Sequence, residues 1–338
     1  MTTHADFLTR DIPGPAPYGR AVFAVAPMID WTDRHCRFFH RQLSGRALLY
    51  TEMVTAPAIV HGDRGRLLDF DAGEHPLALQ IGGSDPAELR QATRIAADWG
   101  YDEINLNVGC PSDRVQSGCF GAVLMKTPDL VAECVSGMIA VSPVEVTVKC
   151  RIGVDDQQAA DVLPDFLGKM RQAGIRRMTI HARKAWLQGL SPRENREVPP
   201  LDYPLVHAMK REFPDLHLSV NGGISDLEAA RAHLTVMDGV MIGRAAYHQP
   251  WQVLGQADLL WDSPPPFEDA RQVAQAMRPR IIAHLERGGR LHQFTRHMLG
   301  LFHGQPGARG WKRTLSEGSG GGIEVYDAAL AQLAPVEA

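Results

Sequence analysis

The stretch Asp102–Ser112 reads DEINLNVGCPS and joins a short strand pattern to a tight turn. Polar and apolar side chains alternate along its first six residues, with the period of two that is typical of a half-buried β-strand. Gly109 and Pro111 frame the turn, and Cys110 lies between them. A thiol at the C-terminal mouth of a strand can act as nucleophile or proton donor, but a lone cysteine there is more often buried and inert. The rest of the chain has to decide between these two interpretations.

Short β-branched or aliphatic runs recur at even spacing on both sides of this stretch, and helix-length segments separate them. Strand–helix alternation repeated eight times over about 225 residues is the signature of a (β/α)8 barrel. A doubly wound sheet usually has fewer strands and opens with a G-x-G-x-x-G turn, which is absent after the first run. The sequence therefore predicts an α/β protein with a TIM (β/α)8 barrel. The expected strands are Ala21–Ala26, Ala47–Glu52, Leu77–Ile81, Glu103–Asn107, Val144–Lys149, Arg177–His181, Leu216–Asn221 and Gly239–Ile242.

Several of the intervening segments open with a residue that commonly caps a helix. Ser84 or Asp85 precedes Pro86, and Ser225 precedes Asp226. The expected helices are Pro86–Trp99, Pro128–Ala140, Ala159–Ala173, Leu205–Glu212 and Asp226–His233.

Composition narrows the class of protein. The chain has 338 residues, of which 44% are hydrophobic and 22% charged, as in ordinary globular proteins. No apolar run approaches the roughly 20 residues needed to cross a bilayer, and the N-terminal residues lack the hydrophobic region of a signal peptide. The five cysteines include no C-x-x-C pair. We therefore expect a cytoplasmic protein without a disulfide framework or a metal site.

Charge is distributed unevenly along the chain. The formal net charge is −4, but residues 271–316 contain nine basic side chains and one acidic side chain. A cationic segment on an acidic body is expected where one part of a protein meets a polyanion, although a solvated helical surface would give the same pattern. The basic residues are Arg271, Arg278, Arg280, Arg287, Arg290, Arg296, Arg309, Lys312 and Arg313.

The strand–helix alternation stops at three consecutive prolines, residues 264–266. Apolar residues then recur at helical spacing within Phe267–Leu301, and a glycine run follows at Gly318–Gly322. We expect residues 1–263 to form the barrel and residues 264–338 to form a small helical domain.

Catalytic residues of TIM barrels lie at the C-terminal ends of the strands. Polar groups stand at six of the eight predicted strand ends, which stability alone does not explain. The ends read Ala26-Pro27-Met28, Glu52-Met53, Gln80, Asn107 followed by Cys110, Lys149-Cys150-Arg151, His181-Ala182-Arg183, Asn221-Gly222-Gly223 and Gly243-Arg244.

The last two strand ends suggest a phosphate site. Glycine lacks a Cβ atom, so the backbone N–H groups of Gly222, Gly223 and Gly243 can approach a phosphate closely, and Arg244 adds a positive charge. Lys149 and His181 facing inward would meet the rest of the ligand, and Gln80 could hydrogen-bond the edge of a planar heterocycle. A flat ring system with a phosphate tail, such as FMN, fits this set of residues.

Six motifs together resemble the tRNA-dihydrouridine synthases, over roughly residues 21–316. They are Ala26–Arg34 (APMIDWTDR), Leu79–Gly83 (LQIGG), Asn105–Pro111 (NLNVGCP), Val148–Gly153 (VKCRIG), Ile180–Arg183 (IHAR) and Val220–Ile224 (VNGGI). Three further segments resemble the tRNA-binding signature of the A subfamily. They are His181–Pro192 (HARKAWLQGLSP), Arg193–Arg196 (RENR) and Arg309–Arg313 (RGWKR).

The resemblance implies a barrel that binds FMN and a C-terminal helical domain that binds tRNA, with no obligate protein partner evident. Such enzymes reduce the C5–C6 bond of uridines in the D-loop, and NADPH recharges the flavin. In the A subfamily the targets are uridines 20 and 20a. Hydride from N5 of the reduced flavin would add at C6, and Cys110 would donate the proton to C5 from the opposite face.

The same resemblance assigns roles to individual residues by motif. Cys110 would be the catalytic acid, and Asn107 and Arg183 would contact the target nucleotide. Arg193, Arg196, Arg309 and Lys312 would bind tRNA. The residues expected to bind FMN are Pro27, Met28, Ile29, Gln80, Lys149, His181, Asn221, Gly222, Gly223, Gly243 and Arg244.

Three residues near these motifs are interpreted without a catalytic role. Cys119 lies on the same loop as Cys110 but does not match the motif. Cys150 points away from the site if Lys149 points into it, because successive strand residues face opposite sides. For Glu52, an ion pair with an arginine is the expected arrangement.

Other functions are compatible with parts of the pattern. A flavin barrel that reduces a small molecule, of the dihydroorotate or ene-reductase type, would use the same cofactor site but would not need the basic helical segment. An RNA-binding barrel with a vestigial ligand site would not need a complete set of strand-end residues. A flavin-free lyase or isomerase acting on a phosphosugar would need new roles for Lys149 and Cys110.

Overall fold

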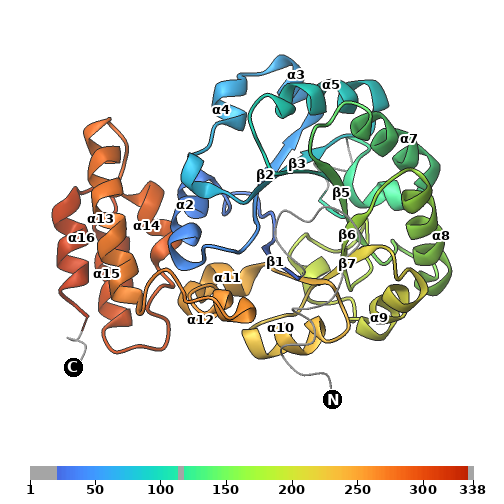
Figure 1. Ribbon diagram of the computed structural model, residues 1–338. Coiled ribbons are helices and arrows are strands. Elements are labelled where there is room, and N and C mark those ends of the chain that lie inside the picture. The colour runs from blue at the N-terminus through green and yellow to red at the C-terminus, as the bar shows by residue number, and fades with distance from the viewer. Residues whose placement is uncertain (1–20, 113–117, 334–338) are drawn as a thin grey trace.

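The computed structural model describes residues 21–112 and 118–333, and eight parallel strands form its centre (Figure 1). The strands pair in the order β1-β8-β7-β6-β5-β4-β3-β2. A bridge between Ala24 and Leu48 joins β1 to the start of β2 and closes the barrel. The predicted (β/α)8 barrel is therefore confirmed. The strands are β1 (Val22–Val25), β2 (Leu49–Thr55), β3 (Leu77–Gly82), β4 (Glu103–Val108), β5 (Glu145–Arg151), β6 (Arg177–His181), β7 (His217–Asn221) and β8 (Gly239–Ile242).

A ring of helices covers the outside of the barrel (Figure 1). Aspartates cap several of them by accepting a backbone N–H in the first turn. Asp85 caps α5, and Asp226 caps α10 by accepting from Ala229. The expected cap at Ser225 is wrong, because its hydroxyl instead donates to the Asp226 carboxylate. The covering helices are α2 (Arg34–Leu43), α3 (Ala56–His61), α4 (Arg64–Leu68), α5 (Pro86–Ala97), α7 (Pro128–Ile139), α8 (Ala159–Gln172), α9 (Tyr203–Glu212), α10 (Leu227–Leu234), α11 (Arg244–His248) and α12 (Pro250–Val253).

Strand alternation produces two kinds of interior. On β4, the side chains of Ile104, Leu106 and Val108 belong to the large hydrophobic core between the strands and the helices. The side chains of the residues between them face the inside of the barrel and are hydrogen-bonded there. The inside of the barrel also holds a small apolar cluster, contributed by β1, β2, β3, β8 and the residues directly before or after β1 and β2. The barrel interior is therefore apolar on one side and polar on the side formed by β4 and its neighbours.

Four helices form a separate group at the C-terminal end of the described chain, beside α2, α11 and α12 (Figure 1). Trp311 and Tyr326 are fully buried in this group, and their rings meet edge to face at 5.5 Å. The predicted helical C-terminal region is thus present, while the boundary at residues 263 and 264 stays a prediction. The helices are α13 (Ala270–Glu286), α14 (His292–Met298), α15 (Ala308–Glu317) and α16 (Ile323–Leu330).

Ion pairs join the helical group to the barrel. Arg296 Nη2 lies 2.5 Å from Asp33 Oδ2, and His297 Nε2 lies 3.0 Å from Asp33 Oδ1. Burial alone would raise the pKa of Asp33, but the hydrogen bonds and charges of His297 and Arg296 hold it well below its usual range. Because Asp33 also caps α2, one carboxylate connects the N-terminus of a barrel helix to α14.

Some basic side chains of residues 271–316 form ion pairs within the protein, so fewer of them can bind an external anion than the sequence suggests. Among residues 21–112 and 118–333, ion pairs with acids from other parts of the chain engage Arg278 (with Asp327), Arg280 (with Asp71) and Arg296 (with Asp33). The +8 formal charge of residues 271–316 therefore overstates the charge that faces solvent.

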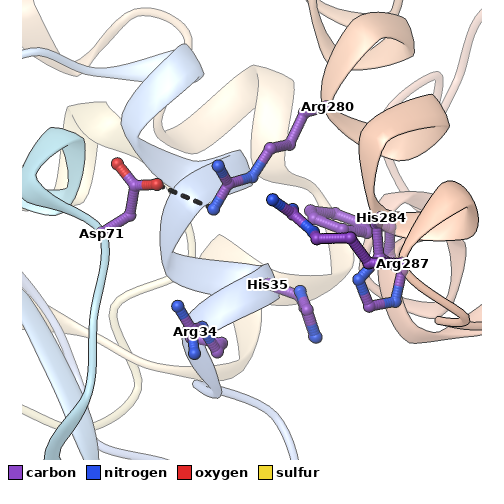
Figure 2. A pocket seen from close by; sticks show the side chains of 7 residues that line it. Arg34, His35, Asp71, Arg280, His284 and Arg287 are labelled. Atoms are coloured by element: carbon purple, nitrogen blue, oxygen red, sulfur yellow. Dashed lines mark ion pairs between the residues drawn. The ribbon is translucent and has the colours of Figure 1, made fainter.

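A cavity of about 420 Å³ lies where α13 meets α2 (Figure 2). Arg280 pairs with Asp71 across it, and Arg34 pairs with Asp69 at 2.7 Å. This cavity shares no residue with the strand ends predicted to bind cofactor or substrate. Its lining residues are Arg34, His35, Asp71, Arg280, His284, Arg287 and Phe294.

Within residues 21–112 and 118–333, the helices are all too short or too polar to cross a bilayer.

Candidate active site

Cys110 lies on a turn that the side chain of Asn107 shapes. Asn107 Oδ1 accepts the backbone N–H groups of Gly109 at 3.0 Å and Cys110 at 2.9 Å. The thiol is half-buried, and its Sγ lies 3.4 Å from the hydroxyl oxygen of Ser112. The turn therefore presents a partly accessible thiol just beyond the C-terminal end of β4.

Arg151, at the end of β5, fastens this turn to the loop after β6. Its Nε donates to the carbonyl of Gly109 at 3.2 Å, and its Nη1 donates to the carbonyls of Lys184 and Asn195 at 3.1 and 2.9 Å. Burial lowers the pKa of Arg151 to about 10; Cys110 opposes this shift, and the charges of Arg196 and Arg183 add to it, so Arg151 remains cationic at neutral pH. Arg151 stands among the polar strand ends of the sequence, but no role was predicted for it. The alternation of β5 could have found it, because Arg151 lies two residues beyond Lys149 on the same face.

Lys149 and His181 bring two basic groups to the mouth of the barrel. Burial, and next the positive charge of Arg151, lower the pKa of Lys149 from 10.5 to about 8. Burial and the same cations hold the pKa of His181 well below its usual range, so its imidazole is neutral. Nδ1 of His181 is buried and has no hydrogen-bond partner among the described residues. A buried ring nitrogen without a partner is costly and indicates a place for a polar ligand.

Gly222 and Gly223 pass directly beside these groups after β7. Gly222 has φ +103°, and a Cβ atom built there would lie 2.9 Å from Cε1 of His181. Gly223 has φ +74°, and a Cβ atom there would lie 2.5 Å from Leu201 Cδ1. Both positions thus require glycine for backbone conformation and for space. Asn221 precedes them and donates from Nδ2 to the carbonyl of Met241 at 2.7 Å, which ties β7 to β8.

Gln80 and Asn107 are joined inside the barrel. Asn107 Nδ2 donates to Gln80 Oε1 at 2.8 Å, and Gln80 is 1% exposed. Gln80 Nε2 also donates to Asn105 Oδ1 at 2.9 Å, and each amide nitrogen has two hydrogens, so one N–H of Gln80 and one of Asn107 remain. The two carboxamides thus form a fixed polar edge near the Cys110 turn.

The first and last strand ends form the opposite wall. A Cβ atom built at Gly243 would lie 3.6 Å from both Ala26 Cβ and Met28 Sδ, so the ends of β1 and β8 are in contact. Met28 and Pro27 are half-buried, whereas the side chain of Ile29 is 54% exposed. The predicted residues of this wall therefore extend from the barrel interior to its rim.

Arg244 and the arginines of the loop after β6 cluster around one carboxylate. Arg244 Nη1 contacts Glu197 Oε1, and Arg193 Nε lies 3.8 Å from the same oxygen. Arg244 Nη2 also donates to the carbonyl of Arg196 at 3.5 Å. An anionic ligand that uses Arg244 has to share it with Glu197.

The loop after β6 is built around Asn195, whose side chain is fully buried. Asn195 Oδ1 accepts the N–H of Trp186 at 2.7 Å, and its Nδ2 donates to the carbonyl of Trp186 at 2.9 Å. The flanking Arg193 and Arg196 are exposed as a result. Arg183, at the start of the loop, donates to the carbonyl of Pro199, and its buried Nε has no partner among the described residues.

Arg309 and Lys312 lie outside this cluster, on α15 of the helical group. Arg309, Lys312 and Arg313 are exposed, and their spacing places them on one face of the helix, opposite the buried Trp311. The charge of Lys312 lowers the pKa of His248, as does that of Arg244, although burial is the larger cause. His248 therefore lies between the barrel mouth and α15.

The three residues interpreted without a catalytic role have separate outcomes. Cys150 is fully buried in the outer core, which confirms that it faces away from the site. Cys119 is exposed, and its lack of a role stays a prediction. The expected ion pair of Glu52 is wrong, because among the described residues its Oε1 instead accepts the backbone N–H of Asp30 at 2.5 Å. Asp30 has φ +66°, so the carboxylate stabilises an unusual turn after β1.

Comparisons with known proteins identify the family that this chain matches. The dihydrouridine synthase (Dus) family model matches residues 24–333. The tRNA-dihydrouridine(20/20a) synthase of Shewanella oneidensis is 55% identical over 310 residues, which cover 91% of this chain and 92% of that protein. The protein of the same name from Escherichia coli (strain K12) is 55% identical over 312 residues, which cover 91% of this chain and 90% of that protein.

A solved structure supports the architecture. An old yellow enzyme homologue from Zymomonas mobilis superposes with a TM-score of 0.54 at 12% identity, covering 77% of this chain and 93% of that one. This likeness concerns the barrel fold alone. The family match extends from β1 to the end of α16, and the relatives match over nine-tenths of their own length. The chain therefore belongs to the dihydrouridine synthase family.

Proposed function

We propose that this protein reduces the C5–C6 bond of uridines 20 and 20a in the D-loop of tRNA, with FMN as cofactor and NADPH as electron donor. The single observation that carries the proposal is the Cys110 turn, which holds a half-buried thiol beside the cationic mouth of the barrel. The names of the relatives at 55% identity support the choice of positions. A tRNA substrate also favours a cytoplasmic location.

The residues at the mouth fit a flat heterocycle that carries a phosphate. Nδ1 of His181 is buried without a partner among the described residues and could bond a polar ligand, and the two glycines after β7 let the backbone pass close to this ring. We assign Lys149, His181 and Gln80 to the ring system, with Pro27, Met28 and Ile29 as the wall beside it. Bound FMN would donate hydride to C6 of uracil after reduction by NADPH. The phosphate-binding residues are assigned as Asn221, Gly222, Gly223, Gly243 and Arg244.

Cys110 would protonate C5 of the base. A thiol is mostly protonated near neutral pH and can therefore donate. After donation it becomes a thiolate, and the cations of Lys149, Arg151 and Arg196 all interact electrostatically with it. Stabilising charge as it develops lowers the barrier to proton transfer. Asn107, whose amide fixes the turn, and Arg183 would contact the target nucleotide.

The target base has to leave its stack to reach a barrel mouth, so the enzyme must bind a flipped-out nucleotide. Exposed cations on two separate elements suit the flanking phosphates. Arg193 and Arg196 are on the loop after β6, and Arg309 and Lys312 are on α15. We infer that residues 1–263 act as the catalytic barrel and residues 264–338 as the helical tRNA-binding domain.

Neutralising the exposed face of α15 should weaken tRNA binding. In the variant with Arg309, Lys312 and Arg313 all replaced by glutamine, we expect lower tRNA affinity, and the slope of log K against log salt should flatten by roughly 2–3, about 0.7–0.9 for each lost phosphate contact. Binding measured at several salt concentrations gives this slope.

The matched control replaces Arg90, Arg94 and Arg211, which are exposed on the outer helices α5 and α9, and removes the same formal charge. An equal loss of slope in the control variant would mean that only net charge matters, and would remove α15 from the binding surface.

Titration of Lys149 should appear in cofactor binding. Its pKa is about 8 in the folded protein without ligand, so the cation that attracts an anionic cofactor is lost as pH rises through 8. We expect FMN affinity of the apoprotein to fall with pH above 8, approaching about tenfold per unit. Quenching of flavin fluorescence between pH 6.5 and 9.5 measures this, and Lys149→Met should bind FMN weakly without the pH dependence. The same slope in Lys149→Met would assign the titration to another group.

The lowered pKa of Lys149 changes folding stability with pH in the opposite direction from FMN affinity. Burial disfavours the cation, so the unfolded chain, with a lysine pKa near 10.5, binds the proton more tightly than the folded protein does. The contribution of Lys149 to the free energy of unfolding should therefore become more favourable as pH rises from about 8 to 10.5, while FMN affinity falls.

The activity is tested by incubating the protein and NADPH with tRNA that lacks dihydrouridine, followed by nucleoside mass spectrometry. We expect dihydrouridine in tRNA and none from free uridine. NADPH-dependent reduction of small enones or of dihydroorotate-type substrates without any tRNA product would favour the small-molecule flavin reductase instead.

A further inference from the structure

A line of buried polar side chains runs inside the barrel from the base of β4 to the Cys110 turn. It consists of Glu103, Thr147, Asn105, Gln80 and Asn107, and we call these five residues the interior ladder. None of them is more than 8% exposed. Polar groups buried to this degree need partners, so each side chain constrains the orientation of the next.

The hydrogen bonds of the interior ladder nearest the base of β4 are donated in the direction of the Glu103 carboxylate. Thr147 Oγ1 donates to Glu103 Oε1 at 2.5 Å, and Asn105 Nδ2 donates to Thr147 Oγ1 at 2.7 Å. A hydroxyl can donate only one hydrogen, so Thr147 must accept from Asn105 once it donates to Glu103. The bond from Thr147 to Glu103 therefore determines that Asn105 turns its Nδ2, and not its Oδ1, toward Thr147.

The upper links continue in the same direction. Gln80 Nε2 donates to Asn105 Oδ1 at 2.9 Å, and Asn107 Nδ2 donates to Gln80 Oε1 at 2.8 Å. Asn107 Oδ1 is then left to accept the backbone N–H groups of Gly109 and Cys110. Every side chain above Glu103 thus donates downward and accepts from above.

The two ends of the interior ladder enforce this direction independently. At the top, backbone N–H groups oblige Asn107 to present its oxygen to the turn. At the bottom, the Glu103 carboxylate can only accept, and it also accepts the hydroxyl of Tyr50 at 2.5 Å. Arg177 Nη1 lies 3.3 Å from Glu103 Oε2 and 2.8 Å from Glu145 Oε2, so an ion pair also holds the Glu103 carboxylate in place. A carboxamide between two partners that can each donate or accept could exchange the places of its oxygen and nitrogen. In the interior ladder this exchange would break the hydrogen bonds at the Glu103 end or those to the backbone N–H groups of Gly109 and Cys110.

We propose that Glu103 is a positioning residue for the flavin site, acting through Thr147 and Asn105 on the carboxamides of Gln80 and Asn107. This inference rests on the proposed function. The ladder uses one hydrogen of each upper amide and leaves one N–H of Gln80 and one of Asn107 as donors for a bound heterocycle. Donors fixed in advance stabilise negative charge on a carbonyl oxygen as the ring is reduced. The same ladder holds Asn107 against the turn that carries Cys110.

The test distinguishes an effect of the ladder's hydrogen bonds from a general loss of core packing. Glu103→Gln also removes the charge opposite Arg177 and can unfold the barrel, so Thr147→Val is the sharper variant. It deletes the hydroxyl in the middle of the ladder and preserves shape. Thr147→Ser keeps the hydroxyl and should behave as wild type. Thr93→Val is the matched control, because Thr93 is fully buried on α5 and its hydroxyl has no partner among the described residues.

The first measurement needs no cofactor. Labelling with ¹⁵N-cysteine gives amide signals for the five cysteines, and Cys110→Ala identifies the one from Cys110. We expect its hydrogen exchange to accelerate by about tenfold in Thr147→Val, the size of one lost hydrogen bond. Thr93→Val and Thr147→Ser should exchange at the wild-type rate. Equal exchange in all four proteins would overturn the coupling between the ladder and the turn.

The second measurement concerns the flavin. In Thr147→Val we expect FMN affinity to fall by about tenfold and the midpoint potential of bound flavin to become more negative, with neither change in Thr93→Val. Wild-type affinity and potential in Thr147→Val, or equal losses in Thr93→Val, would overturn the proposal. If wild-type protein binds no FMN at all, the proposed cofactor is wrong, and exchange of the Cys110 amide alone decides whether the ladder positions the turn.

Discussion

Replacing Cys110 with alanine is expected to lower the rate of dihydrouridine formation by about 10²–10⁴-fold, the usual contribution of a general acid. The thiol is the proton donor that the turn after β4 presents, and alanine leaves the C5 carbon without a positioned proton. FMN and tRNA binding should be unchanged, because the turn is shaped by backbone N–H groups that alanine retains. Single-turnover reduction of tRNA by the NADPH-reduced enzyme measures this rate.

Cys119→Ala provides the matched control for this variant. Cys119 lies nine residues further along the same loop and is exposed, so its removal should leave the rate at the wild-type value. Full activity in Cys110→Ala together with a large loss in Cys119→Ala would transfer the role of proton donor to Cys119. Unchanged rates in both variants would point to a non-cysteine acid.

The second large effect is expected at Gly222. In Gly222→Ala the new Cβ atom would lie 2.9 Å from the ring of His181, so the imidazole or the loop has to move. Since both groups are assigned to FMN, we expect cofactor affinity to fall by about 10–100-fold, which is roughly 1.4–2.8 kcal/mol. Titration of the apoprotein with FMN measures the loss, and excess FMN should restore part of the activity.

Gly100→Ala separates the effect of crowding from that of backbone strain. Gly100 has φ +84°, close to the value at Gly222, but a Cβ atom built there has no neighbour within 4 Å. Both variants should lose about 1–2 kcal/mol of unfolding free energy from the left-handed backbone, whereas only Gly222→Ala should lose FMN affinity. Wild-type FMN binding in Gly222→Ala would place the cofactor away from this loop.

The barrel was predictable because its signal is local. Each strand is a short apolar run between helix-length segments, and period-two alternation was enough to place Cys150 in the outer core and Lys149 on the opposite face of β5. The predicted and observed strands differ by at most three residues at their ends: β2 continues three residues beyond Glu52, and Asn107 and Lys149 are followed by one and two further strand residues. Site residues at strand ends follow from the fold once the strands are known.

The features that could not be predicted from the sequence are ion pairs and hydrogen bonds between residues far apart along the chain. Arg296 pairs with a carboxylate 263 residues away, and Arg278 with one 49 residues away, so the basic segment was judged too cationic. The interior ladder spans three strands, and its links join residues 25 to 44 positions apart. Alternation predicts that Glu103 and Thr147 face inward, but the pairing of β4 with β5 is needed to bring their oxygens to 2.5 Å.

The central claim is tested most directly by mapping dihydrouridine along the D-loop. Purified protein and NADPH are incubated with tRNA from cells that lack all dihydrouridine synthases, and the modified positions are read by mass spectrometry of nuclease fragments. We expect reduction at uridines 20 and 20a and at no other D-loop uridine. Dihydrouridine elsewhere in the loop would contradict the positions proposed here, and tRNA without any dihydrouridine would contradict the proposed activity itself.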